Sequence, residues 1–159
     1  MPRIAFALLL GLMVANSAAA QRPSALRPVD FVVANISDST DSAKVRALLG
    51  APDSVTAGDH PNVAGGKLID WWYPDTRISY HDKATVRGVW LLAAGHHTAR
   101  GIALGDSRSR VRALYGAPAR SNPDEDAWVY RDPSADDHLL KLWFSGGRVS
   151  RVFLGWTLD

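Results

Sequence analysis

Apolar residues recur at helical spacing twice along this chain, within two nearly identical octets. VRALLGAP occupies residues 45–52 and VRALYGAP occupies residues 111–118, and seven of the eight residues are the same. In each copy three apolar residues stand at i, i+3 and i+4, which is the stripe of an amphipathic helix. They are Val45, Leu48 and Leu49 in the first copy and Val111, Leu114 and Tyr115 in the second. The pattern therefore predicts one short helix in each half of the chain.

Each predicted helix lies between residues that begin and end helices. Ser39, Thr40 and Asp41 are possible N-caps of the first helix. Asp106 and Ser107 are possible N-caps of the second. After each helix a glycine stands where the left-handed conformation is needed, and a proline two residues later prevents continuation. These stop residues are Gly50 and Pro52 in the first copy and Gly116 and Pro118 in the second.

A Trp-x-Tyr pattern, typical of a strand, follows each helix. Trp71 and Tyr73 in the first copy recur as Trp128 and Tyr130 in the second. The first copy has nine additional residues before this pattern, and they fall within residues 59–67. The Pro, Asn and paired Gly of that stretch predict a loop.

A β-hairpin is predicted at the end of each repeat. In the second copy, apolar runs at residues 139–144 and 148–154 flank Gly146-Gly147, which is typical of a hairpin turn. The equivalent runs of the first copy are residues 77–81 and 86–92. We therefore predict an α+β fold of two tandem repeats, each a short helical layer packed on an antiparallel sheet of about three strands. The repeats could share a core side by side or form one continuous curved sheet.

The N-terminus has the pattern of a secretory signal peptide. Arg3 precedes an apolar run at residues 4–14, which is too short to span a bilayer, and a cleavage pattern ends at Ala20. We expect an exported mature protein, periplasmic or extracellular, and an uncleaved membrane anchor is the alternative. The expected organisation is a signal peptide in residues 1–20, a linker in residues 21–29, a first repeat in residues 30–98 and a second in residues 99–159.

Composition narrows the function classes. The chain has no Cys, so it has neither a disulfide framework nor a lipid-modified N-terminal cysteine, and we expect no membrane anchor in the mature chain. The 18 basic residues nearly balance the 16 acidic ones, which argues against a nucleic-acid partner. We expect a monomer with a protein partner.

Catalytic and metal-binding patterns are weak. Neither G-x-S-x-G nor H-E-x-x-H occurs, and no Cys can ligate zinc. The best metal-like cluster is Asp136-Asp137-His138, where Asp is common for turn formation. We therefore expect no enzyme activity, no metal and no cofactor. A hydrolase built on one His and one Asp is the remaining catalytic alternative, and it requires the two side chains within hydrogen-bond reach in a pocket.

Aromatic residues that differ between the copies are better candidates for function than those that recur. Trp72 aligns with Val129 and Trp143 aligns with Ser79, so the fold does not require a Trp at either place. Alternation along the strands places Trp143 with Lys141 and Val152 on one hairpin face. The predicted partner-binding residues are Trp72, Lys141, Trp143 and Val152, on the helix-free face of the sheet. The alternative is that this face is a buried seam between the repeats.

The order of these motifs resembles the motif order of a known protein family. In the second copy the motif residues are Ile102, Gly105, Val111, Gly116, Pro118, Trp128, Tyr130, Phe144 and Gly147. This series resembles the SmpA/OmlA (BamE-like) family, and that resemblance implies a small envelope domain that binds proteins and is not an enzyme. The tandem is similar to the β-lactamase-inhibitor-protein architecture, in which one face of a long curved sheet grips the partner. The chain departs from these proteins at Ser39, which stands where the second copy has Gly105, and in having no lipidated or disulfide-bonded cysteine.

The leading hypothesis is a secreted or periplasmic, non-enzymatic protein-interaction module of the bacterial cell envelope. The alternative is a small-ligand or glycan-binding protein that uses exposed Trp residues as stacking platforms.

Overall fold

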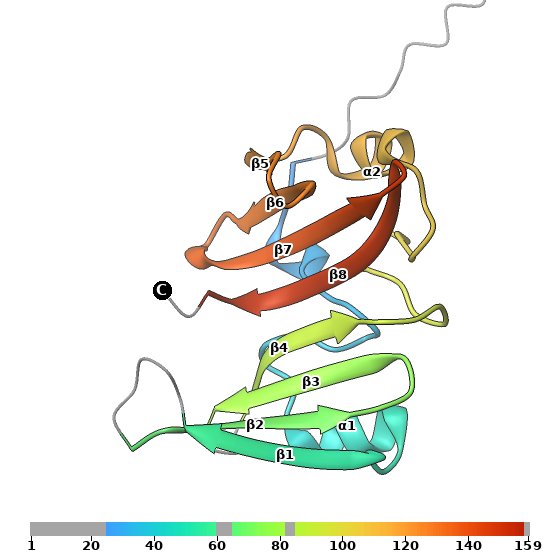
Figure 1. Ribbon diagram of the computed structural model, residues 1–159. Helices are drawn as coiled ribbons and strands as arrows, with labels where there is room; N and C mark the ends of the chain where they lie inside the picture. Colours follow the sequence, from blue (N-terminus) through green and yellow to red (C-terminus); the bar gives the residue numbers. More distant parts are fainter. Residues whose placement is uncertain (1–24, 60–64, 82–84, 158–159) are drawn as a thin grey trace, which may run out of the picture.

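The computed structural model describes residues 25–59, 65–81 and 85–157, so the predicted signal peptide lies outside the described residues. The described chain forms one eight-stranded antiparallel sheet with two α-helices of eight residues each (Figure 1). The helices are α1 (Ser42–Leu49) and α2 (Arg108–Tyr115), preceded by a 3-10 helix, η1 (Pro28–Asp30). The strands are β1 (Ser54–Asp59), β2 (Lys67–Trp72), β3 (Thr76–His81), β4 (Val86–Leu91), β5 (Arg120–Asn122), β6 (Ala127–Asp132), β7 (Ala135–Ser145) and β8 (Arg148–Trp156).

The predicted fold class is wrong. We predicted two repeats, each a helical layer on about three strands, whereas four strands from each half join in one sheet and each half contributes one short helix. The unpredicted strands are β1 and β5, which form the two edges of the sheet. All six residues of β1 are exposed, so its sequence lacks the apolar alternation of a half-buried strand. β5 has only three residues.

The predicted helix boundaries are confirmed in both halves. The Asp41 side chain accepts a hydrogen bond from the Lys44 N–H at 2.7 Å, and the Ser107 hydroxyl accepts one from the Arg110 N–H at 3.2 Å. Both helices end at the predicted glycines, which have φ of +83° at Gly50 and +79° at Gly116.

A tyrosine fastens the end of each helix to the sheet. The Tyr73 hydroxyl donates to the Gly50 carbonyl at 3.3 Å, and the Tyr130 hydroxyl donates to the Gly116 carbonyl at 3.2 Å. These are the tyrosines of the two Trp-x-Tyr patterns. The recurrence of this pattern therefore reflects a contact that each half makes between its helix and its sheet.

The two halves meet at a pseudo-two-fold axis between β4 and β8. The strand order is β1-β2-β3-β4-β8-β7-β6-β5, so each strand of one half has its equivalent at the mirrored place in the other. On the axis Trp90 of β4 pairs with Phe153 of β8, and these two aromatic residues occupy equivalent places in the two copies of the repeat. On either side Val89 pairs with Leu154 and Leu91 with Val152. The sheet therefore continues through the axis without interruption (Figure 1).

Both helices pack on the same face of the sheet. Val45 of α1 and Val111 and Tyr115 of α2 are buried in one core with strand residues of both halves. The prediction that Leu48 belongs to the buried stripe of α1 is wrong, because its side chain is 40% exposed. The eight-residue α1 contacts the core through Val45 and Leu49 instead.

The recurring tryptophans lie on this helix-covered face. Trp128 is buried, with its ring centroid 5.0 Å from that of Phe144. Trp71 is only partly buried, with its ring 4.8 Å from that of Tyr80 and the Arg46 guanidinium of α1 at 4.7 Å. Their neighbours along the strands therefore point to the opposite face.

A β-bulge corrects the predicted faces of β8. Trp143 pairs with Arg151 and Phe144 pairs with Val149, which leaves Ser150 as an extra residue on β8. Beyond the bulge every side chain of β8 points to the face opposite to the one predicted. Val152 is therefore fully buried in the core and cannot belong to the predicted partner-binding surface.

A buried ion pair connects the N-terminal segment to the second half. The Arg100 guanidinium donates to the Asp30 carboxylate at 2.7 Å and to the Leu114 carbonyl, at the end of α2, at 2.8 Å. The Asp30 and Arg100 side chains are 9% and 10% exposed. The hydrogen bond from Arg100 holds the pKa of Asp30 below its ordinary value, although burial opposes this.

Candidate functional site

The face of the sheet opposite α1 and α2, which we name the open face, carries a continuous row of side chains. Cross-strand pairing places one residue of each strand in this row. From β1 to β5, in sheet order, they are Ser54, Trp72, Arg77, Trp90, Phe153, Lys141, Val129 and Arg120. Aromatic and cationic side chains therefore fill the middle of the face, with the Trp90–Phe153 pair at its centre.

In the first half, Arg77 lies between two tryptophans. Its guanidinium is 5.1 Å from the ring centroid of Trp72 and 4.5 Å from that of Trp90. The Trp72 indole N–H donates to the Thr56 hydroxyl at 3.0 Å. The Asp70 carboxylate is 4.0 Å from the Arg77 guanidinium. These contacts hold the side chains in one orientation.

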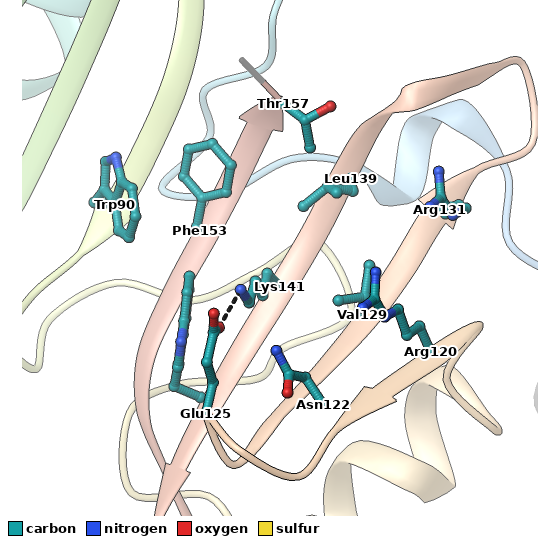
Figure 2. Close-up of a pocket in the computed structure, with 11 residues that line it drawn as sticks. Trp90, Arg120, Asn122, Glu125, Val129, Arg131, Leu139, Lys141, Phe153 and Thr157 are labelled. Carbon is teal, nitrogen blue, oxygen red and sulfur yellow. Dashed lines mark hydrogen bonds and ion pairs between the residues drawn. The ribbon is translucent and has the colours of Figure 1, made fainter. Parts of the chain in front are cut away.

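In the second half, Trp143 stacks on Trp90 with a centroid distance of 5.6 Å and an interplanar angle of 23°. The Arg151 guanidinium is 4.3 Å from the Trp143 ring centroid, and the Lys141 ammonium is 4.6 Å from it. Lys141 also forms an ion pair with Glu125 (Figure 2). The hydrogen bond from Lys141 lowers the pKa of Glu125.

Positive charge prevails around the aromatic residues of the open face. The cations there are Arg77, Arg87, Arg120, Arg131, Lys141 and Arg151, and the carboxylates there are Asp70 and Glu125. The whole chain is nearly neutral. This face therefore concentrates a positive charge that the sequence composition does not reveal.

Two pockets flank the central Trp90–Phe153 pair. The second-half pocket, of about 380 Å³, lies among Trp143, Lys141, Val129, Arg120 and Arg131 (Figure 2). The first-half pocket, of about 320 Å³, is lined mainly by apolar groups, with Arg77 and Arg87 among its lining residues.

The predicted site residues are only partly brought together. Trp72, Lys141 and Trp143 lie on the open face, and Val152 does not. Arg77, Trp90, Arg151 and Phe153 were missed. Trp90 and Phe153 are aromatic residues at equivalent places in the two copies, so we interpreted them as residues that the fold requires and did not predict them as site residues. Arg151 and Phe153 were placed on the wrong face because the bulge has no sequence signal.

A histidine–carboxylate pair lies elsewhere, on the helix-covered side. The His138 Nδ1–H donates to Asp132 at 2.8 Å, and the Ser134 hydroxyl donates to the same carboxylate at 2.6 Å. Burial acts to raise the pKa of Asp132, but the bonds from Ser134 and His138 outweigh it and lower the pKa. Both Ser134 and His138 bind the carboxylate, so Ser134 is not hydrogen-bonded to the histidine as a nucleophile would be. The pair joins β6 to β7, and Asp132, Ser134 and His138 line a pocket of about 400 Å³, so the histidine and carboxylate that the hydrolase alternative requires are present together.

The predicted cluster Asp136-Asp137-His138 does not converge on one point. His138 is buried against Phe31 and Trp156, whereas Asp136 and Asp137 are exposed. Among the described residues, no group of three or more His, Asp or Glu side chains is placed to hold a metal ion.

Comparison with known proteins shows a similarity of fold and nothing more. No protein-family model and no curated protein matches the chain. A solved structure that resembles it is an extracellular protein containing a SCP domain from Bacillus anthracis str. Ames, with a TM-score of 0.54 and 9% sequence identity. The match covers 95% of this chain and 51% of that one, so the chain spans about half the length of that protein. The resemblance to the SmpA/OmlA family stays a prediction.

None of the helices in the described part of the chain is long and apolar enough to cross a membrane.

Proposed function

We propose that this protein is exported and non-enzymatic, and that it binds an acidic protein partner through the open face. The observation that supports this most is the row of side chains across the eight strands, in which three aromatic and three cationic residues are gathered. Trp and Arg are the residues most enriched at the energetic centres of protein interfaces. The proposal of export rests on the signal-peptide pattern of residues 1–20.

The size of the open face suits a specific interface. Strands lie roughly 4.8 Å apart and rise roughly 3.3 Å per residue, so eight strands of about six residues span roughly 34 Å by 20 Å. The resulting area is close to the roughly 800 Å² per partner of a standard protein interface.

The contacts within the row favour binding because they order the side chains in advance. An interface side chain that becomes immobile on binding costs about 0.5–1.5 kcal/mol. Arg77 is already held between Trp72 and Trp90, and Arg151 already lies over Trp143. Much of this cost is therefore met during folding.

Charge complementarity favours an acidic partner. Within the described residues, Arg120 and Arg151 are exposed and form no salt bridge, although Glu125 lies near enough to Arg151 to interact with its charge. Carboxylates of a partner would find exposed cations at both places. The association should accelerate at low ionic strength, because surface charges steer the encounter.

Glycan stacking fits the open face less well. A sugar needs a free indole face, whereas Arg77, Arg151 and Lys141 lie over the rings of Trp72, Trp90 and Trp143. The aromatic platforms predicted for the alternative function are thus already occupied by cations.

The test is capture of a partner from envelope extract and culture medium by the tagged mature protein. Trp72→Ala should weaken capture by about 2 kcal/mol or more, as expected for an aromatic anchor. Arg151→Glu should weaken it too, and the loss should diminish in high salt. Lys44→Glu is the matched control, because it makes the same charge change at an exposed position on α1. Equal capture by Arg151→Glu and Lys44→Glu would exclude the open face as the binding surface.

A further inference from the structure

The two halves of the open face differ at one pair of equivalent positions. Trp143 of β7 and Ser79 of β3 occupy equivalent places relative to the pseudo-two-fold axis. Each lies two residues after an equivalent cation of the row, Lys141 on β7 and Arg77 on β3. In the second half the Trp143 indole fills this place and stacks on Trp90. In the first half the small Ser79 leaves the place empty, and the first-half pocket lies there.

The empty place keeps the surroundings of an aromatic ring. Phe153 lines the first-half pocket and is the equivalent of Trp90, on which Trp143 stacks. Leu68 and Trp156 add further apolar surface. A pocket of about 320 Å³ lies in the range of about 300–1,000 Å³ typical of ligand sites. An incoming ring would therefore meet Phe153 as Trp143 meets Trp90.

The polar side chains of the pocket favour an aromatic ring that also carries a hydrogen-bonding group. The polar side chains that line the pocket include Asp70, Arg77, Ser79 and Arg87. The Asp70 carboxylate, which accepts from the Ser79 hydroxyl at 2.5 Å, lines the same pocket. A phenol can donate a hydrogen bond to this carboxylate while its ring lies on Phe153. A ligand carboxylate would instead face Asp70 with like charge.

We propose that the first-half pocket is a receptor for a tyrosine side chain of the partner. The ring would stack on Phe153, and the hydroxyl would donate to Asp70. This inference rests on the proposed function, because the tyrosine belongs to the protein bound on the open face.

The pocket can be tested without the partner, with 4-methylphenol as the probe. In nuclear magnetic resonance titrations the Trp156 indole N–H signal should shift and saturate. Toluene, the matched probe without a hydroxyl, should bind about fivefold more weakly, which is the effect of one hydrogen bond. No saturable shift at Trp156, or equal affinity for both probes, would overturn the proposal.

The equivalence of Ser79 and Trp143 suggests two variants that test the pocket. Ser79→Trp places in the first half the residue that the second half already holds, and should abolish probe binding. Trp143→Ser empties the equivalent place and should create a second probe site beside Trp90. If Ser79→Trp does not fold, Asp70→Ala removes the hydrogen-bond acceptor and should reduce the preference for 4-methylphenol over toluene. Unchanged probe binding in a folded Ser79→Trp, or an unchanged preference in Asp70→Ala, would contradict the assignment.

Partner capture separates this inference from the proposed function. Ser79→Trp should reduce capture at least tenfold. Loss of probe binding with undiminished capture would overturn the tyrosine assignment and leave the proposed function intact. If the unmodified protein captures nothing, the proposed function and the tyrosine assignment both fail, and the titration then reports only the chemistry of the pocket.

Discussion

At the scale of single residues, Gly50 and Gly116 adopt a backbone conformation that other residues avoid. Their φ values of +83° and +79° are combined with ψ values of −161° and −157°. The sequence predicted the positive φ, but the extended ψ makes the conformation more restrictive than the left-handed helical one, since glycine alone adopts it readily.

Gly50→Val and Gly116→Val should each lower the free energy of unfolding by about 1–3 kcal/mol, because a β-branched residue is strained there. Urea denaturation measures the effect. Gly58→Val is the control for Gly50→Val, because Gly58 also has open space around it but lies in the exposed strand β1 without a positive φ. A loss as large at Gly58 as at Gly50 would show that strain is not the cause.

The tryptophans of the two faces should also differ in their effect on stability. Trp128→Ala should cost about 3–5 kcal/mol, as expected for a buried aromatic residue. Trp143→Ala should cost less than Trp128→Ala, because the half-buried Trp143 ring loses the stack on Trp90, worth about 0.5–1.5 kcal/mol, and only partial burial. Trp71 is partly exposed, so Trp71→Ala should cost less than Trp128→Ala. Equal losses for Trp128→Ala and Trp143→Ala in urea melts would mean that the open face is covered.

At the scale of elements, the tyrosine that joins each helix to its sheet can be tested in isolation. Tyr130→Phe should lower the free energy of unfolding by about 0.5–1.5 kcal/mol, because the Gly116 carbonyl loses its hydrogen-bond donor. Tyr80→Phe is the matched control, since the Tyr80 hydroxyl is buried without a partner in the described chain. Its removal should be neutral or stabilising. Thermal melts that rank the two variants in the opposite order would contradict this assignment.

Elements could be predicted from the sequence where local residues determine them. Both helices follow from their caps, from the stripe at Val45 and Val111, and from their glycine stops, and the hairpin between β7 and β8 follows from Gly146-Gly147. β1 could not be predicted, because an edge strand exposed on both faces has no periodic pattern. The bulge at Ser150 depends on packing between strands, so the local sequence does not encode it.

The same limit explains the candidate site. Trp72 and Trp143 were found because they differ between the copies. Arg77 and Arg151 were missed because their importance comes from the rings beside them, which cross-strand pairing determines. Val152 was assigned to the wrong face by the one-residue shift.

At the scale of the whole molecule, the ion pair between Asp30 and Arg100 makes stability depend on pH. The pKa of Asp30 is lower in the folded protein than its unfolded value of about 3.9. Its contribution is therefore present above that value and is lost as the pH falls through the folded pKa. Urea melts between pH 6 and about pH 2 should show this loss.

Asp30→Ala should cost about 3–5 kcal/mol at neutral pH, because Arg100 then stays buried without its carboxylate. The acid dependence of the variant should be shallower than that of the unmodified protein. Asp124→Ala is the control at an exposed carboxylate and should change neither the stability nor its slope with pH. A parallel pH profile for Asp30→Ala would assign the acid sensitivity to other groups.

The pairing of Trp90 with Phe153 has a consequence for the history of the chain. Two identical subunits that join through one edge, each residue on the axis facing its own copy, form a symmetric homodimer. The present chain has the form of such a dimer with its subunits fused into one polypeptide. In a homodimer of identical subunits, one mutation alters both subunits at once. In a single chain, positions such as Ser79 and Trp143 can differ, and this freedom allows a single binding place on one side of a symmetric surface.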